Sequence, residues 1–179
     1  FMEIKKIVTG VLEENCYVLS KDGTCLIVDP GSDSKKIKEL VGDDKIIGVL
    51  VTHAHFDHIG ALRDFLSSNR RLKIFKKSNL TDLKEVSVGT FKFIPIMTPG
   101  HSSDSVTFYF KEDNAMFVGD FIFRDTVGRC DLPTGSSSET DKSIEKIKAY
   151  DDSICLYPGH GDETTLGREK QYNLYFIEK

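Results

Sequence analysis

The pattern of apolar positions in the first third of the chain predicts β-strands. Segments 3–10, 15–20 and 24–29 are rich in Ile, Val, Leu and Tyr, which are enriched in strands. Lys-Asp-Gly at 21–23 predicts a tight turn between the second and third segments. The run KIIGVLVT at 45–52 is mostly apolar, as expected of a strand buried on both faces.

In other segments the apolar residues recur at helical intervals, which predicts helices. In 32–42, apolar residues recur at helical intervals between a serine or aspartate suited to the N-cap and a closing glycine. We expect further helices at 60–69 and in the tail, 165–179. The segment 138–150 begins with Ser-x-x-Asp, a start of capping-box type, and is also predicted to be helical.

Short strands and a loop account for the rest of the chain. We expect strands at 71–76 and 153–160, a strand pair at 86–98, a hairpin at 105–120 that turns at 111–114, and a polar loop at 124–138. Strands and helices alternate twice, which predicts sheets inside and helices outside in four layers. We predict a single domain, 2–179, and treat Phe1, ahead of Met2, as foreign to the natural chain.

Length and charge narrow the function classes. A chain of 179 residues suits one domain with a real core. The formal net charge of −4 disfavours nucleic-acid binding, which relies on clustered Lys and Arg. The apolar runs are too short to span a bilayer, and the N-terminus turns polar at once. We therefore expect a cytoplasmic protein with neither a membrane partner nor a secretory leader.

The four cysteines include no Cys-x-x-Cys pair, which predicts reduced thiols rather than disulfides or a structural zinc site. Cys16, Cys25 and Cys155 lie in or beside apolar runs, where cysteine behaves as a small buried hydrophobe. Cys130 has a more polar setting.

Three of the five histidines fall in one short segment. His53, His55 and His58, with Asp57 among them, follow the apolar run 45–52. His53 and His55 alternate, so both can point to one side of an extended backbone, while Asp57 and His58 can face a second point once the chain turns. The alternative, a solvated polar loop, does not explain why this segment follows an apolar strand.

The other two histidines, His101 and His160, each close a Pro-Gly-His tripeptide that can aim an imidazole into a common space. Asp120 follows a glycine after another predicted strand. Alone, each histidine could be a core residue with its hydrogen bonds satisfied, and Asp120 could be a helix N-cap. Together, imidazoles and carboxylates from several loops indicate a zinc- or iron-type metal site. They exceed what one tetrahedral ion needs, which suggests a pair of ions.

The order His-x-His-x-Asp-His, Gly-His, Gly-Asp and Gly-His resembles the metallo-β-lactamase superfamily over nearly the whole chain. The resemblance implies an α/β fold, an αββα sandwich of two mixed β-sheets flanked by helices. It also implies that the first metal is held by His53, His55 and His101, the second by Asp57, His58 and His160, and both by Asp120. Asp29, in Val-Asp-Pro-Gly at 28–31, would lie behind the ligands or, alternatively, only end a strand.

Within the superfamily, GRCDLPTGSS at 128–137 is similar to the Gly-Arg-Thr-Asp segment of short bacterial members of the glyoxalase II group, the hydroxyacylglutathione hydrolases. Arg129 would grip a substrate carboxylate by paired hydrogen bonds or, alternatively, fix its loop in an ion pair. Cys130 replaces the threonine and is expected to pack rather than to attack substrate. Only 19 residues follow His160, so we expect no counterpart of the helical C-terminal domain of full-length glyoxalase II enzymes. We therefore expect weak glutathione affinity or a preference for smaller thioesters.

These features predict a binuclear metal-dependent thioester hydrolase. A hydroxide bridging two divalent metal ions would attack the acyl carbon, with Asp57 orienting it and Asp120 joining both sites. Thiolate leaves readily without a strong general acid. Zinc is the first expectation, with iron and manganese as alternatives. The expected partner is a small-molecule thioester such as S-lactoylglutathione, and the sequence leaves the oligomeric state open.

Three alternatives stay open. One is another hydrolase of the same fold that acts on a lactone or a β-lactam, although the lack of a leader disfavours an antibiotic-degrading enzyme. Another is a sulfur (persulfide) dioxygenase related to glyoxalase II, with a single iron. The third is a non-catalytic metal-binding or interaction protein, which a missing ligand would favour, and none is missing.

Overall fold

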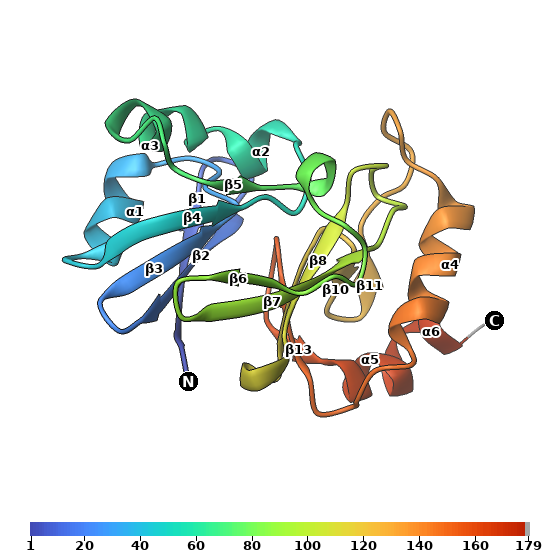
Figure 1. Cartoon of the computed structure of the whole chain (residues 1–179). Coiled ribbons are helices and arrows are strands. Elements are labelled where there is room, and N and C mark those ends of the chain that lie inside the picture. The colour runs from blue at the N-terminus through green and yellow to red at the C-terminus, as the bar shows by residue number, and fades with distance from the viewer. Residues whose placement is uncertain (178–179) are drawn as a thin grey trace.

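Two β-sheets pack face to face between outer layers of helices (Figure 1). The computed structural model describes residues 1–177. In spatial order, the first sheet consists of β1 (Glu3–Thr9), β2 (Glu14–Lys21), β3 (Thr24–Val28), β4 (Lys45–Leu50) and β5 (Ile74–Phe75). β1, β2 and β3 pair antiparallel, whereas β4 runs parallel to both β3 and β5.

The second sheet is also mixed. In spatial order it consists of β13 (Thr164–Thr165), β12 (Cys155–Pro158), β9 (Ala115–Gly119), β8 (Val106–Phe110), β7 (Phe91–Met97) and β6 (Val86–Val88). Only β12 and β9 are parallel. The expected hairpins at 86–98 and 105–120 are both present, the latter turning through η2 (Lys111–Asp113).

Helices cover the outer face of each sheet (Figure 1). The helices on the first sheet are α1 (Ser34–Val41), α2 (Phe56–Ile59) and α3 (Leu62–Ser68), and those on the second are α4 (Ser137–Ile147), α5 (Leu166–Tyr172) and α6 (Leu174–Ile177). A 3-10 turn, η1 (Lys77–Asn79), follows β5, and β10 (Ile122–Phe123) pairs with β11 (Thr126–Val127) in a small hairpin. The predicted αββα sandwich of mixed sheets is confirmed.

Three apolar clusters fill the spaces between the four layers. The cluster between the sheets is rich in aromatic rings, among them Tyr17, Phe93 and Phe117. Another joins the first sheet to α1 and α3 through Ile37 and Phe65, and the third joins the second sheet to α4 and the C-terminal helices. Strands that contribute to two clusters alternate their side chains between them, because successive residues point to opposite faces. Burial of this apolar surface is the main term that stabilises the sandwich.

Two helix starts differ from the sequence prediction. Asp33 precedes α1 but has φ 55° and forms no side-chain cap; its carboxylate instead accepts the N–H of Gly10 at 3.1 Å. Helix α4 is capped by Ser136, whose hydroxyl accepts the N–H of Glu139 at 3.2 Å, two residues before the predicted start. In both places a local pattern offered several polar residues, and tertiary contacts selected among them.

Three other segments differ in extent. The predicted strand at 71–76 shrinks to the two residues of β5, and the loop at 124–138 begins with β11. The predicted C-terminal helix is split at Asn173, which donates to Thr126 O at 3.0 Å and accepts the N–H of Tyr175 at 3.0 Å. Asn173 therefore ends one helix, caps the next and ties both to the β10–β11 hairpin. The last two residues of the predicted tail helix, 178–179, lie outside the described chain.

The topology brings several strand ends to one edge of the sandwich. β9 and β12 are parallel, and just beyond them the N–H of Gly159 donates to Gly119 O at 2.9 Å. Two hydrogen bonds join the sheets there: Val106 N to Thr52 O at 2.8 Å and Asn15 N to Gly159 O at 2.7 Å. The loops that follow β4, β9 and β12 are therefore held rigidly side by side.

Candidate metal centre

All seven residues that the sequence singled out as metal ligands converge at this edge. They form two groups, one of His53, His55 and His101 and one of Asp57, His58, Asp120 and His160. In each group, one possible ligand atom per residue lies within 4.8 Å of those of all the others. The chain therefore gathers two separate clusters of nitrogen and oxygen donors, from positions up to 107 residues apart in the printed sequence (His53 to His160).

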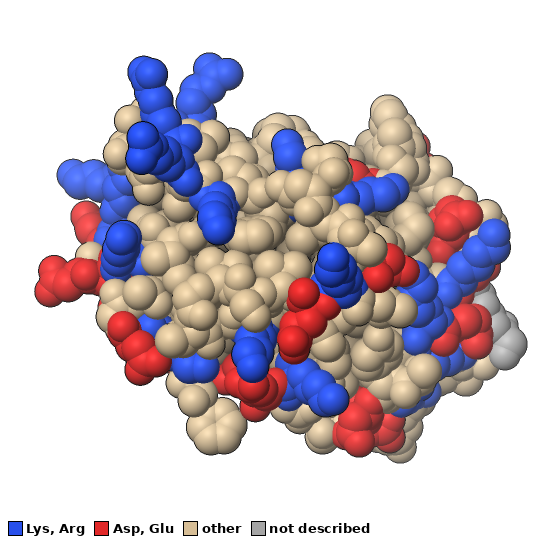
Figure 2. Space-filling view, viewed as in Figure 1, with Lys and Arg blue, Asp and Glu red and all other residues tan. Residues whose placement is uncertain are grey.

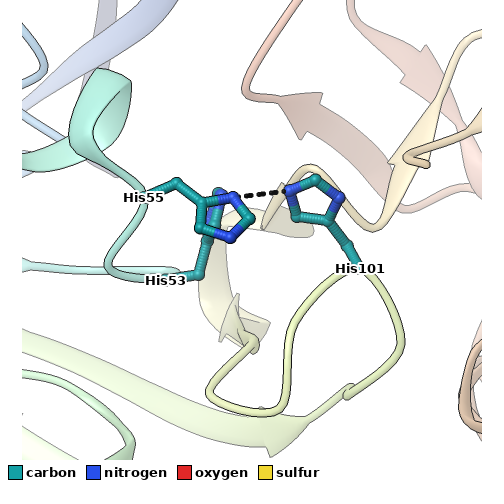
Figure 3. A group of neighbouring side chains, drawn as sticks. All are labelled: His53, His55 and His101. Carbon is teal, nitrogen blue, oxygen red and sulfur yellow. Dashed lines mark hydrogen bonds between the residues drawn. The ribbon is translucent and has the colours of Figure 1, made fainter. Parts of the chain in front are cut away.

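The first group contains only imidazoles (Figure 3). His53 lies three residues beyond the end of β4, His55 is the N-cap residue of α2, and His101 lies in the loop between β7 and β8. His101 Nε2 and His55 Nδ1 are 3.0 Å apart, and the ring centroids of His53 and His55 are separated by 4.7 Å. The alternation of His53 and His55 does direct both rings to one side, as the sequence suggested.

Asp120 lies between the two groups. Its Oδ1 is 3.1 Å from His58 Nε2, and its Oδ2 is 3.4 Å from His101 Nε2 and 3.5 Å from His160 Nε2. Asp57 completes the second group, with Oδ2 at 3.1 Å from His160 Nε2 and 3.4 Å from His58 Nε2. A carboxylate with one oxygen near each group has the geometry needed to join two cations.

Hydrogen bonds behind the rings fix which nitrogen faces the cluster. The Nδ1–H of His101 donates to the carbonyl of Arg129 at 2.8 Å, and that of His58 donates to Asp29 at 2.8 Å. His53 Nδ1 lies 3.0 Å from the hydroxyl of Thr52, which itself donates to Asp29. In each case the Nε2 lone pair is left to face the cluster, which is the tautomer that a metal ligand requires.

Asp29 is buried behind the ligands, the first of the two roles that the sequence left open. Its Oδ1 accepts the N–H of Thr52 at 2.8 Å, and its Oδ2 serves both the Thr52 hydroxyl and His58. It also ends β3 with φ 52°, so the turn role holds as well. Although Asp29 could itself join His53 and His58 around a cation, its oxygens already accept these hydrogen bonds.

The sequence reasoning missed Glu14 and two residues that support the His160 loop. Glu14 is buried beside His58, and burial together with the charge of Asp29 raises the pKa of its carboxyl to about 9. Asn15 donates to Pro158 O at 3.0 Å, and the hydroxyl of Tyr17 donates to the same oxygen at 2.6 Å. The signal was a cluster of polar residues, Glu-Asn-Cys-Tyr, at the start of a strand that is otherwise buried.

The donor set fits a metal. Three buried atoms at its centre, His53 Nε2, His58 Nε2 and Asp120 Oδ1, have no hydrogen-bond partner among residues 1–177. An orphaned buried polar atom is costly, and native proteins rarely keep one without a ligand or water. Imidazole nitrogens and carboxylate oxygens are the ligands of zinc and of related first-row ions.

Without a metal, protons supply part of the missing positive charge. Hydrogen bonds with Asp120 and Asp57 raise the pKa of His160 to about 10. Burial raises the pKa of Asp120, but the imidazoles of His160 and His58 beside it outweigh burial and hold that pKa well below its usual value. Burial lowers the pKa of His53 to about 2. The cluster therefore combines the ionised carboxylate of Asp120 with a protonated His160 and a neutral His53, and cations can replace its protons.

A pocket of about 660 Å³ opens beside the first group. The ligands His55, Asp57, His101 and Asp120 contribute to its wall. Five apolar residues, Leu12, Ala54, Phe56, Leu132 and Pro133, line the rest of it together with polar residues of the loops at 102–104 and 129–134. The ligand cluster is therefore accessible to a small molecule rather than sealed inside the fold.

Arg129 lines this pocket and also forms an ion pair with Asp131. Its Nε and Nη2 donate to the two carboxylate oxygens at 2.7 and 2.8 Å. This is the second of the two roles that the sequence left open for it. Cys130 packs beside it, with Sγ 3.1 Å from the hydroxyl of Thr140.

Charge is unevenly distributed over the surface. Figure 2 shows blue side chains gathered at the end of the molecule that carries α3, and mixed signs over the rest of that face. Exposed basic residues in and after α3 include Arg63, Arg70, Arg71 and Lys73. The predicted absence of a nucleic-acid partner therefore stays a prediction. Within residues 1–177, no helix is long and apolar enough to cross a bilayer.

Comparison with known proteins identifies the fold family. The family model described as the metallo-β-lactamase superfamily matches residues 9–70 and 68–160. A probable metallo-hydrolase of Bacillus subtilis, YqgX, is 30% identical, with 96% of each chain covered. The hydroxyacylglutathione hydrolase GloC of Haemophilus influenzae is 27% identical, with 99% of this chain and 100% of that protein covered.

Two solved structures are similar over nearly their whole length. The B3 metallo-β-lactamase BLEG-1 superposes with a TM-score of 0.92 at 29% identity, covering 97% of this chain and 99% of that one. TTHA1623 in a di-iron-bound form gives a TM-score of 0.85 at 27% identity, covering 94% and 98%. The chain therefore belongs to the metallo-β-lactamase superfamily, with the fold and the histidine and aspartate clusters of a metal-dependent hydrolase.

Proposed function

We propose that this protein is a thioester hydrolase of glyoxalase II type that uses two divalent metal ions. The observation that carries the proposal is the pair of ligand groups that share Asp120 beside an accessible pocket. His53, His55 and His101 would hold one ion, Asp57, His58 and His160 the other, and Asp120 both. Zinc is the first candidate; iron and manganese are alternatives, and the di-iron form of TTHA1623 supports iron.

When bound, such ions supply hydroxide near neutral pH and polarise a carbonyl oxygen. The chain's own contribution is orientation. Asp57 lines the pocket and is held by His160 at 3.1 Å, so its carboxylate can orient the attacking water from a fixed position. Arg129 O and Asp29 hold two histidines in the ligand tautomer, so little reorganisation accompanies the reaction.

The side chains of the pocket favour hydrolysis by water with a good leaving group. Ser102 is hydrogen-bonded to Asp104 and Ser105 and not to a histidine, so it lacks the base that an attacking serine needs. The carboxylate of Asp104 is occupied by the Ala54 N–H and the Ser102 hydroxyl. With no carboxyl free to protonate a departing amine, a thiolate is the better leaving group.

The 27% identity to GloC over whole chains supports a hydroxyacylglutathione thioester as the first substrate to test. The proposed partner is thus a small molecule, S-lactoylglutathione or a smaller thioester. All four cysteines are free thiols, which supports the further proposal of a cytoplasmic location.

The deciding assay measures anaerobic thiol release from S-lactoylglutathione and from simple thioesters by protein loaded with zinc, iron or manganese. Asp120→Asn should abolish turnover, because it weakens both ligand groups with little change in volume, whereas Asp64→Asn on the exposed face of α3 should not. If thioesters are untouched while iron-loaded protein consumes oxygen with glutathione persulfide, the protein is a dioxygenase and the hydrolase proposal is wrong.

A second candidate is hydrolysis of a β-lactam or lactone, which the similarity to BLEG-1 favours. The same loaded protein should then open a chromogenic cephalosporin or an acyl homoserine lactone faster than it releases thiol from any thioester. Comparing kcat/KM across the three substrate classes separates the two candidates.

A further inference from the structure

The pocket beside the ligand cluster has little free charge. Its charged lining residues are Asp57, Asp104, Asp120 and Arg129. Asp57 and Asp120 belong to the second ligand group, and Asp104 accepts the Ala54 N–H at 2.9 Å and the Ser102 hydroxyl at 2.7 Å. Arg129 is therefore the only Arg or Lys side chain that lines this wall, and beside the proposed metal ions its state contributes to whether the pocket attracts an anionic substrate.

That cation is already neutralised. Two guanidinium nitrogens of Arg129 donate to the two oxygens of Asp131, at 2.7 and 2.8 Å, in the paired geometry by which arginine binds carboxylates. Asp131 thus occupies the position that a substrate carboxylate would take. The backbone of Arg129 is fixed independently, because its carbonyl accepts the Nδ1–H of His101 at 2.8 Å.

Exposed apolar side chains form much of the rest of the mouth, beside the hydroxyl residues Ser102, Ser103 and Thr134. The side chain of Phe56 is 75% exposed and that of Leu12 is 50% exposed, although both are large hydrophobic residues. Leu132 and Pro133, which follow Asp131 directly, contribute further apolar surface. Covering such surface with an apolar group lowers the free energy of the complex, whereas a carboxylate placed there loses hydration.

We propose that Asp131 determines the charge preference of this pocket: by neutralising Arg129 it makes the protein select uncharged, apolar acyl thioesters over thioesters that carry a carboxylate. This inference rests on the proposed function, and of the two substrates named there it favours a smaller neutral thioester over S-lactoylglutathione, which carries carboxylates. The pair is exposed and therefore screened by water, so we expect a preference of modest size that the loss of Asp131 changes measurably.

The test uses two thioesters that differ by one carboxylate, S-butanoyl-N-acetylcysteamine and S-butanoyl-N-acetylcysteine. We expect the wild-type protein to have the higher kcat/KM for the neutral compound. Asp131→Asn should raise the ratio of anionic to neutral kcat/KM by roughly threefold to tenfold, mainly through KM, because it frees a guanidinium for the substrate. Asp22→Asn, at the distant turn between β2 and β3, is the matched loss of one exposed charge and should leave the ratio unchanged.

A double variant tests whether the ion pair of Arg129 and Asp131 causes the change in the kcat/KM ratio. In Arg129→Gln/Asp131→Asn the ratio should fall back toward the wild-type value, since the guanidinium that Asp131→Asn frees is then absent. A wild-type preference for the anionic thioester would overturn the inference, as would a ratio that Asp131→Asn leaves unchanged.

Binding without turnover separates this inference from the proposed function. Two stable thioethers, S-butyl-N-acetylcysteamine and S-butyl-N-acetylcysteine, can be titrated calorimetrically into metal-loaded protein. We expect the wild-type protein to bind the neutral thioether more tightly. Asp131→Asn should raise the affinity for the anionic thioether relative to the neutral one. If neither thioester is hydrolysed, the proposed function fails, and the thioether affinities still decide the charge preference. If the wild-type protein and Asp131→Asn each bind the two thioethers with equal affinity, the inferred charge preference is wrong.

Discussion

At the residue scale, one buried carboxylate organises much of the ligand cluster. Asp29 accepts hydrogen bonds from the backbone and hydroxyl of Thr52 and from His58, and through Thr52 it also reaches His53. It adopts φ 52°, an unusual conformation for a residue other than glycine, and its N–H is held by Leu50 O at 3.0 Å. Backbone strain of this kind persists where the surrounding structure fixes it, commonly at functional sites.

Asp29→Asn should weaken metal binding in both ligand groups. An asparagine side chain has one acceptor oxygen and an NH₂ donor, so it cannot accept all three hydrogen bonds, and the ring nitrogens of His53 and His58 lose their fixed tautomer. We expect metal affinity to fall about 10- to 100-fold, as is typical for partners behind metal ligands. Competition with a chromophoric chelator measures it; an unchanged affinity would show that Asp29 only ends its strand.

Gly159 illustrates how closely the backbone approaches the ligands. A Cβ at this position would overlap Asp120 Oδ1 and His58 Cε1, so Gly159→Ala should reduce metal content strongly. Gly161→Ala is the control, because its Cβ meets nothing within 4 Å and only its φ of 79° is strained. That variant should lose about 1 kcal/mol of stability but keep its metal. Elemental analysis beside thermal melts distinguishes the two effects; equal metal contents would contradict the prediction.

At the element scale, helix starts show where local sequence is ambiguous. The segment Ser136-Ser137-Ser138-Glu139 offers three candidate caps, and the structure uses the first. The choice is tertiary, because the N–H of Ser136 donates to Gly100 O at 2.8 Å, next to His101. The start of α4 is thereby attached to the loop that carries a ligand.

Ser136→Ala should lower the free energy of unfolding by about 1 kcal/mol, the usual cost of losing an N-cap side chain. Ser138→Ala, at the start that the sequence suggested, should change it by less than about 0.5 kcal/mol, as exposed substitutions do. Urea denaturation of the two variants gives the comparison. A larger loss of unfolding free energy in Ser138→Ala than in Ser136→Ala would place the cap at Ser138.

At the scale of the whole molecule, metal binding and protonation are coupled. In the metal-free protein the pKa of Glu14 is raised from 4.5 to about 9, and that of His160 from 6.5 to about 10. A folded pKa above the unfolded value means that the bound proton stabilises the fold. This contribution is fully present below the unfolded pKa and is lost as pH rises through the folded pKa.

Metal removal should therefore destabilise the protein more at high pH. Metal-free protein should lose stability between about pH 7 and pH 9.5, whereas metals bind ligands such as His160 more tightly as these deprotonate. We expect the difference in Tm between zinc-loaded and EDTA-treated protein to widen from pH 6.5 to pH 9. Calorimetry across that range tests it; a difference that narrows would be inconsistent with this coupling.

The sequence by itself determined the fold class and the donor set. Strand and helix spacing predicted most elements, and the motifs around His53, His101, Asp120 and His160 identified donors whose side-chain chemistry is independent of context. Periodicity and residue type are local properties, so a single chain carries them. The boundaries of short elements were less certain, because several adjacent residues satisfy the same local rule.

Only the tertiary structure decided which residues act together. The buried position of Glu14 and the pairing of Arg129 with Asp131 rather than an open side chain depend on contacts between segments. The grouping of donors around Asp120 was implied by the family resemblance, but no local pattern in the chain predicts it. Asp29 and Thr52 are 23 residues apart, and Asn15 and Pro158 are 143 apart, yet each pair is hydrogen-bonded. Such contacts follow from how parallel strand ends meet at one edge of two packed sheets, which no local pattern encodes.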